Sequence, residues 1–331
     1  MEIKAADVAK LRQMTGAGMM DCKKALVEAN GDYERAKEII REKGKLVAAK
    51  RADRETSEGR VIAKVNGGKA IVVGLGCETD FVAKNEEFKA LAEAIADAAI
   101  ASFPADKDAL MACVLADGRT VEAAVTEQTG KTGEKHQIAG YEVVEAPYVV
   151  AYMHNVTGKL AAVVGFNKEF DAQVAKGVAM QVASMNPVAV SAESVPQSVI
   201  DAELKTATEK TKEELVQKAV DAALTKAGIN PAHVDSEAHI ESNQAKGWIT
   251  AEQAEQAREI IKTVSAEKAA NLPEQMVANI AKGRLQKFFK EQTLDEQGYQ
   301  MGDVKTAVKD VVKAADAEAK IVTFKSVSLA D

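Results

Sequence analysis

The chain has 331 residues, 47% of them hydrophobic, a length and composition typical of a globular protein with two or three domains. A formal net charge of −7, the lack of a long basic run and an aromatic content of 4% disfavour direct binding of nucleic acid, which needs cations for phosphates and rings for base stacking. Three widely spaced cysteines support neither a disulfide framework nor a zinc site, and no signal peptide or membrane-spanning run is visible, so we expect a cytoplasmic protein without membrane contact.

Residues 4–44 predict three short helices. The first ends at Gly16-Ala17-Gly18, where glycine permits a tight turn, and the second ends at Asn30-Gly31. Asp32 caps the third helix, which we expect to end at Gly44. The second helix carries residues at helical spacing, namely Met19, Cys22, Leu26 and Ala29. Such a bundle has a small core, and we interpret residues 1–47 as a partner-binding module similar to the ubiquitin-associated type.

A polar linker, residues 48–59, leads to the first half of a core domain, residues 60–145. Two apolar runs, 61–65 and 70–73, flank Asn66-Gly67-Gly68 and predict a β-hairpin. A loop over residues 76–84 follows the hairpin. An amphipathic helix then runs to about residue 101, a weaker helix covers 120–129, and residues 137–145 predict a strand.

The second half of the core, residues 146–195 plus 293–331, repeats this order. It predicts a hairpin over 148–164, then a helix containing Phe170, and finally a helix and a strand at 304–315 and 321–329. Asn85-x-Glu-Phe in the first half matches Asn167-x-Glu-Phe in the second, which favours an internal duplication. The second copy lacks the nine residues Gly76 to Lys84, so this loop is an addition to the shared architecture.

Residues 196–292 are rich in Ala, Lys, Glu and Gln and predict a long antiparallel helical projection inserted in the second half. We expect the single tryptophan, Trp248, to pack beneath the turn at its tip. The predicted fold class is therefore α+β: a three-helix module, a duplicated core of two antiparallel-sheet-plus-helix halves, and the inserted helical hairpin.

No motif for a nucleotide, cofactor or metal is found. Gly130-Lys131-Thr132 lacks the first glycine of a phosphate-binding loop. A nucleophile with its base would have to be assembled from Cys77, Glu78, Asp80 and His154. Their spacing matches no known catalytic signature. A cysteine at a strand end is more often a small buried apolar residue. We expect no catalytic residue and no resident metal.

The tip of the added loop, Thr79-Asp80-Phe81-Val82, carries an aromatic side chain beside an acid. Phe81 either folds back onto the helix of Phe88 or inserts into a partner protein. Physical chemistry alone leaves both alternatives open, and the absence of these residues from the second half favours the partner. Met20 poses the same choice, since Met19, Cys22 and Leu26 are expected to fill the core face.

Two long motifs, residues 11–26 (LRQMTGAGMMDCKKAL) and residues 77–84 (CETDFVAK), resemble the bacterial translation elongation factor Ts family. The resemblance covers nearly the whole chain outside the insertion. It implies guanine-nucleotide exchange on elongation factor Tu, with residues Thr79 to Val82 intruding beside the partner's magnesium site, displacing the cation and loosening GDP. It also implies partner contacts at Arg12, Met19, Met20 and His154.

Two departures from the family pattern bear on this expectation. The insertion is longer than the coiled-coil hairpin of the best-known relatives, so its role in docking or in pairing two copies as a homodimer is left open. The chain stops at Asp331, so we expect no C-terminal helical module, and the N-terminal module and core would carry the affinity. Two rival hypotheses are a scaffold without exchange activity and a hydrolase that uses Cys77.

Overall fold

The computed structural model describes residues 3–329, which form two compact units. Among the described residues, the first unit comprises 3–190 and 294–329, and the second comprises Ser191–Thr293. The outermost residues of the expected N-terminal module and second core half, 1–2 and 330–331, lie outside the described residues. In the described chain no helix is long and apolar enough to cross a membrane.

Three helices open the first unit: α1 (Ala5–Thr15), α2 (Met19–Glu28) and α3 (Tyr33–Lys50). As predicted, Gly16 takes a left-handed conformation, with φ of 67°, and Asp32 caps α3 by accepting from the backbone N–H groups of Glu34 and Arg35. The predicted end of α3 at Gly44 is wrong. Gly44 is buried inside the helix, where it faces Gly130 of α7 (Val121–Thr132), and the packing of these two helices favours continuation to Lys50.

The rest of this unit contains two antiparallel three-stranded sheets. The first has the order β1-β2-β3, and the second has the order β4-β5-β6. The strand bounds are β1 (Glu58–Asn66), β2 (Lys69–Cys77), β3 (Gln137–Glu145), β4 (Tyr148–Met153), β5 (Leu160–Phe166) and β6 (Ile321–Ser328). The central strands β2 and β5 are almost entirely buried, because each sheet is covered on both faces.

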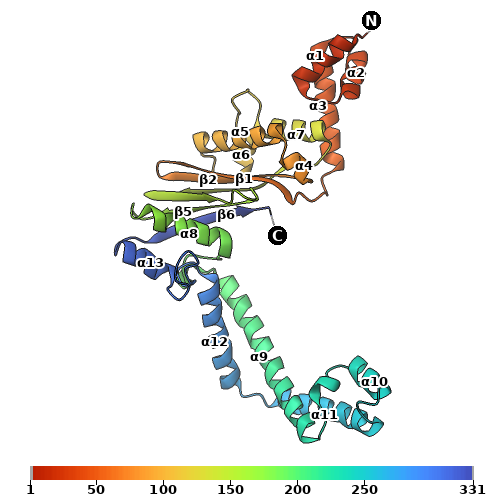
Figure 1. Cartoon of the computed structure of the whole chain (residues 1–331), viewed down its shortest axis with the longest axis vertical. Coiled ribbons are helices and arrows are strands. Elements are labelled where there is room, and N and C mark those ends of the chain that lie inside the picture. Colours follow the sequence, from red (N-terminus) through yellow and green to blue (C-terminus); the bar gives the residue numbers. More distant parts are fainter. Residues whose placement is uncertain (1–2, 330–331) are drawn as a thin grey trace. The chain divides into compact units, whose positions relative to one another are not determined.

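The two sheets and their helices stack in four layers (Figure 1). Alternate strand residues such as Val72 and Val163 form an apolar core between the sheets. The outer face of the first sheet is covered by α5 (Glu86–Ser102), α6 (Lys107–Ala112) and α7, and the outer face of the second by α8 (Ala172–Met185) and α13 (Val308–Ala315). The α+β class and the duplicated core are thus confirmed.

A shared irregularity marks the duplication. The pairing register shifts between Gly74 and Leu75 in the first sheet and between Gly165 and Phe166 in the second, at matching positions of the two central strands. After this point the halves diverge. β5 ends at Phe166, whereas β2 continues to Cys77, two residues into the expected loop, because Glu58 to Asn66 of β1 pair with it to its end.

The prediction that the helix of the second half contains Phe170 is wrong, because the two matching asparagines have different roles. Asn85 caps α5 by accepting from the N–H of Glu87 at 2.8 Å. Asn167 instead exchanges hydrogen bonds with the chain before β6, accepting from Lys320 at 2.7 Å and donating to the carbonyl of Glu318 at 2.9 Å. The second helix, α8, therefore begins only after Asp171, which caps it.

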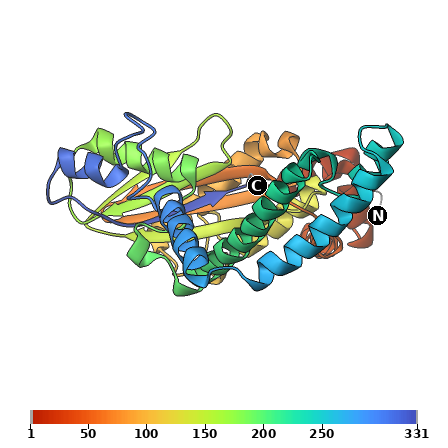
Figure 2. The ribbon, with the colours of Figure 1, turned by 90° about the horizontal axis from the view of Figure 1, so that it is seen from below.

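The second unit is helical. Its helices are η1 (Ala192–Ser194), α9 (Gln197–Lys226), η2 (Pro231–His233), α10 (Glu237–Ala245), α11 (Ala251–Ala270) and α12 (Glu274–Gln292). α9 packs against both α11 and α12 (Figure 2). Thr250 and Gln253 form a capping box at the start of α11.

The expected packing of Trp248 is wrong. Its side chain is 61% exposed, with its ring 5.5 Å from that of His233 and the Lys246 ammonium 5.1 Å above it. The neighbouring Ile249 takes the buried position and joins the apolar core of this unit, which leaves the indole at the surface.

Candidate functional site

The predicted tip of the added loop is a single helical turn, α4 (Asp80–Ala83), that follows the end of β2. Thr79 is its N-cap: the hydroxyl oxygen accepts a hydrogen bond from the backbone N–H of Val82 at 3.4 Å. A turn of four residues is too short to be stable by itself, because helix nucleation is costly, so its shape depends on the residues that hold it.

The side chains of α4 divide between core and solvent. Val82 and Ala83 pack against the apolar core beneath α5. Phe81 points away and is 83% exposed, so the alternative in which it folds back onto the helix of Phe88 is wrong. A phenylalanine that is held in water on an anchored turn loses the free energy of burial, and it regains that energy only on meeting another surface.

Asp80 is paired within the same turn. The Lys84 ammonium lies 2.6 Å from its carboxylate, at the i,i+4 spacing that favours such pairs. The hydrogen bond and charge of Lys84 lower the pKa of Asp80, so the carboxylate is ionised at neutral pH. Both side chains are substantially exposed, and an exposed pair of this kind is cheap to break. Asp80 is thus available to a new partner.

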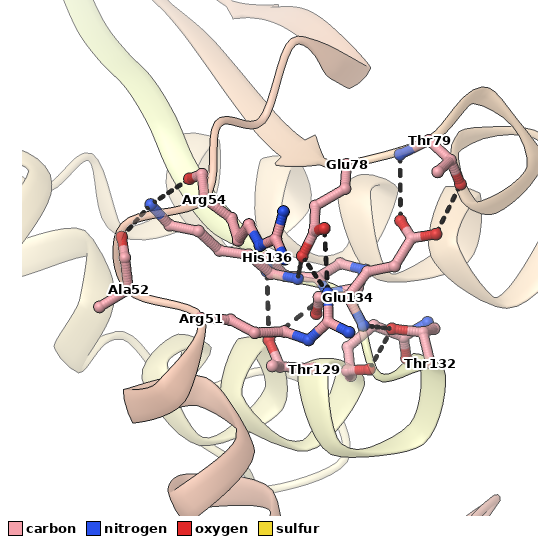
Figure 3. A network of polar contacts seen from close by, with 11 residues as sticks. Arg51, Ala52, Arg54, Glu78, Thr79, Thr129, Thr132, Glu134 and His136 are labelled. Atoms are coloured by element: carbon pink, nitrogen blue, oxygen red, sulfur yellow. Dashed lines mark hydrogen bonds and ion pairs between the residues drawn. The ribbon is translucent and has the colours of Figure 1, made fainter.

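A network of carboxylates holds the residues just before α4 (Figure 3). Glu134 accepts hydrogen bonds from both the backbone N–H of Thr79, at 3.0 Å, and its hydroxyl, at 2.6 Å. Glu78 accepts from the backbone N–H of Lys135 at 2.6 Å and from the Arg51 guanidinium at 2.8 and 3.0 Å. Burial acting alone would raise the pKa of Glu78, but the bonds from Lys135 and Arg51 outweigh it and lower the pKa.

Sequence reasoning missed Glu134, Lys135 and Arg51. The usable signal was the position of Glu134, which follows the glycine that ends α7 and precedes β3, the neighbour of β2. Lys135 also donates to the carbonyls of Ala52 and Arg54, at 2.6 and 2.8 Å. Part of the segment expected to be a polar linker is therefore bound to Lys135, whose backbone N–H also bonds Glu78 just before α4.

The residues weighed as a nucleophilic centre do not form one. Cys77 is fully buried and its thiol donates to the carbonyl of Thr79 at 3.3 Å. Burial, together with the negative charges of Glu134 and Glu58, raises the pKa of the Cys77 thiol to about 12. His154 lies beyond the end of β4 in the other sheet, where its Nδ1 is 3.1 Å from the Tyr152 hydroxyl.

We expect Cys77 to resist alkylation by a maleimide at pH 7 in the folded protein, because a thiol of this pKa supplies almost no thiolate. Peptide mass mapping of the native and the urea-unfolded protein checks this result. Cys113, which is partly exposed, is the internal control and reacts first in the native state. Rapid native labelling of Cys77 would contradict the expectation and revive the hydrolase hypothesis.

The N-terminal module presents the other predicted contact residues. Arg12 is exposed, and Met19 and Met20 are 43% and 64% exposed. The expectation that Met19 belongs to the core of the module is wrong. It is the first residue of α2, and the core is filled by Leu11, Cys22, Leu26 and other buried residues deeper in the bundle. Both methionines therefore form part of the surface.

Comparison with known proteins places these features in a family. A family model described as "Elongation factor TS" matches residues 78–331. Elongation factor Ts of Bacteroides fragilis is 56% identical over 329 residues, and that of Phocaeicola vulgatus is also 56% identical over 329 residues. Elongation factor Ts of Porphyromonas gingivalis is 39% identical. Each alignment covers 99% of this chain and 99% of the relative.

Proposed function

Because this chain belongs to the elongation factor Ts family and is thus a translation elongation factor, we propose that it promotes the release of GDP from elongation factor Tu. On this proposal α4 inserts beside the magnesium and nucleotide site of the GTPase, and the complex stabilises the nucleotide-free state until GTP binds. The observation that carries the proposal is Phe81, 83% exposed on a helical turn anchored to the core.

Exchange requires that the factor bind the nucleotide-free GTPase more tightly than the GDP-bound form, and by reciprocity GDP then weakens the factor. Reversing an equilibrium from about 1:99 to about 99:1 takes about 5.5 kcal/mol of differential affinity. Burial of one phenylalanine side chain contributes roughly 1.5–3 kcal/mol. Phe81 alone is insufficient, and we assign the remainder to Asp80 and to contacts made by Arg12, Met19, Met20 and His154.

Asp80 is suited to act on a cation site. Its carboxylate is ionised and its bond to Lys84 is exposed, so a partner's groups can replace Lys84 at little cost. We propose that Asp80 competes for the surroundings of the magnesium ion while Phe81 occupies an apolar space next to it. Thr79 and Val82 belong to the same contact: Thr79 caps the turn and Val82 anchors it to the core.

In this role the protein binds and remodels a partner and carries out no covalent chemistry, and we propose that it does so in the cytoplasm without a cofactor. The pairing of two copies through the helical insertion stays a prediction, which a mass measurement in solution would check.

The test of the proposed function is a stopped-flow experiment. Elongation factor Tu loaded with a fluorescent GDP is mixed with this protein and an excess of unlabelled GDP. We expect release to accelerate with protein concentration and to saturate, whereas the GTPase mixed with unlabelled GDP alone sets the basal rate. Formation of a complex without any acceleration of release would overturn the proposal in favour of the scaffold hypothesis.

A further inference from the structure

The carboxylates of Glu78 and Glu134 lie just beyond the point where the pairing of β2 with β3 stops. β2 and β3 pair antiparallel as far as Gly76 and Gln137. If that register continued, Glu78 would lie opposite Lys135, and Thr79 opposite Glu134. No backbone ladder forms there. Two side-chain hydrogen bonds take the place of the backbone pairing, one from each segment. Glu78 accepts from the backbone N–H of Lys135, and Glu134 accepts from the backbone N–H of Thr79.

Glu134 is itself held in place. Gly133 ends α7 in a left-handed conformation, with φ of 74°, which turns the chain toward β3. The backbone N–H of Glu134 donates to the Thr132 hydroxyl at 3.1 Å. The Nδ1–H of the buried His136 donates to the carbonyl of Glu134 at 2.9 Å. The carboxylate therefore projects from a turn whose backbone is fixed at both ends (Figure 3).

The hydroxyl of Thr79 connects the fixed Glu134 carboxylate to α4. The Thr79 O–H donates to Glu134 at 2.6 Å, so its oxygen lone pairs face the backbone N–H of Val82, at 3.4 Å. Glu134 thus sets the rotamer with which Thr79 caps the turn. The orientation of the turn in turn decides that Val82 faces the core while Phe81 faces solvent.

We propose that Glu134 is a positioning residue for exchange: it touches no nucleotide, and it presents Phe81 by fixing Thr79. This inference rests on the proposed function. A carboxylate is required because two donors of one residue, an N–H and an O–H, converge on it. Glutamine has only one side-chain oxygen, so its NH2 group would face one of the two Thr79 donors or force the Thr79 hydroxyl to turn. We therefore expect Glu134→Gln to keep only part of the exchange activity that Glu134 supports.

The test compares Glu134→Ala, Glu134→Gln and a control, Glu142→Gln. Glu142 lies on β3, is partly exposed, and bonds Lys325 at 3.0 Å, away from α4. In the stopped-flow assay we expect Glu134→Ala to lower the maximal release rate about tenfold, the loss typical of a hydrogen-bonded charged group, with Glu134→Gln between it and the wild type. Glu142→Gln should keep the wild-type rate.

A double-mutant cycle separates positioning from general damage to the fold. If Glu134 acts through Phe81, Glu134→Ala added to Phe81→Ala causes little further loss of rate. An equal fold-loss in both backgrounds, or a wild-type rate for Glu134→Ala, would overturn the proposal. If Glu134→Ala does not fold, the same cycle is run with Glu134→Gln, which is similar in shape, and the same two outcomes decide.

A readout without the GTPase distinguishes failure of this inference from failure of the proposed function. Lys84, at the end of α4, is 75% exposed and can be cleaved by trypsin once the turn loosens. We expect brief digestion followed by mass mapping to show faster cleavage after Lys84 in Glu134→Ala than in the wild type or Glu142→Gln. Equal cleavage in all three proteins would overturn the positioning role, even if exchange activity is present.

Discussion

Phe81→Ala is expected to lower the maximal rate of GDP release from elongation factor Tu by about one to two orders of magnitude. On the proposed mechanism Phe81 is buried only in the complex, so its loss removes roughly 1.5–3 kcal/mol, and each 1.4 kcal/mol corresponds to about a factor of ten. The fold should not change, because the side chain is 83% exposed and contributes little to the core. Stopped-flow release and the thermal unfolding midpoint measure the two effects.

Asp80→Ala should also slow release with an unchanged unfolding midpoint, because the carboxylate is lost while its ion pair with the exposed Lys84 contributes little to stability. Val114→Ala is a matched control for Phe81→Ala, since Val114 is 62% exposed and lies in the connection between α6 and α7, outside residues 79–82. Wild-type release rates for both Phe81→Ala and Asp80→Ala would refute the proposed mechanism.

Gly130→Ala is expected to destabilise the first unit by about 1–3 kcal/mol, as overpacked sites commonly do. A Cβ on Gly130 would lie 2.9 Å from the Cα of Gly44, so the helices α3 and α7 would have to move apart. The atom that the added Cβ would meet belongs to the backbone of Gly44, so no flexible side chain can move aside. The N-terminal module, which carries Met19 and Met20, would shift relative to α7 and the turn at Glu134.

Gly44→Ala is the matched control for the same crossing. A Cβ on Gly44 would lie 3.5 Å from the Cα of Gly130, an ordinary contact. Alanine is favoured over glycine inside a helix by roughly 1 kcal/mol, so we expect Gly44→Ala to be neutral or stabilising. Urea unfolding of the two variants measures the difference, and equal midpoints would show that the crossing does not limit stability.

Local chemistry was enough to predict most elements. Asn66-Gly67-Gly68 predicted the first hairpin, and the spacing of apolar residues predicted α5. These features depend on neighbours in the chain, such as the positive φ that glycine permits and the N–H groups that a capping side chain satisfies. The duplication was also visible, because matching landmarks recur in the same order.

Expectations failed where distant residues decide the outcome. Gly44 has the local character of a helix end, but packing against Gly130 of α7 favours a longer helix. Trp248 was expected to pack beneath the turn at the tip of the insertion, but the neighbouring Ile249 occupies the buried position, in a core shared with α9. Asn85 and Asn167 have different roles because only Asn167 lies beside the chain that leads into β6.

An added tip with an aromatic residue beside an acid could be recognised from the order of residues alone, and the family motifs in the chain indicated the class of partner to expect. The direction in which the side chains of that tip face could not be predicted from the order of residues. Phe81 and Val82 are neighbours of similar apolar character, and their opposite exposures follow from the orientation of a turn capped by Thr79. That orientation depends on Glu134, 55 residues away, whose carboxylate reaches Thr79 because β2 and β3 are paired.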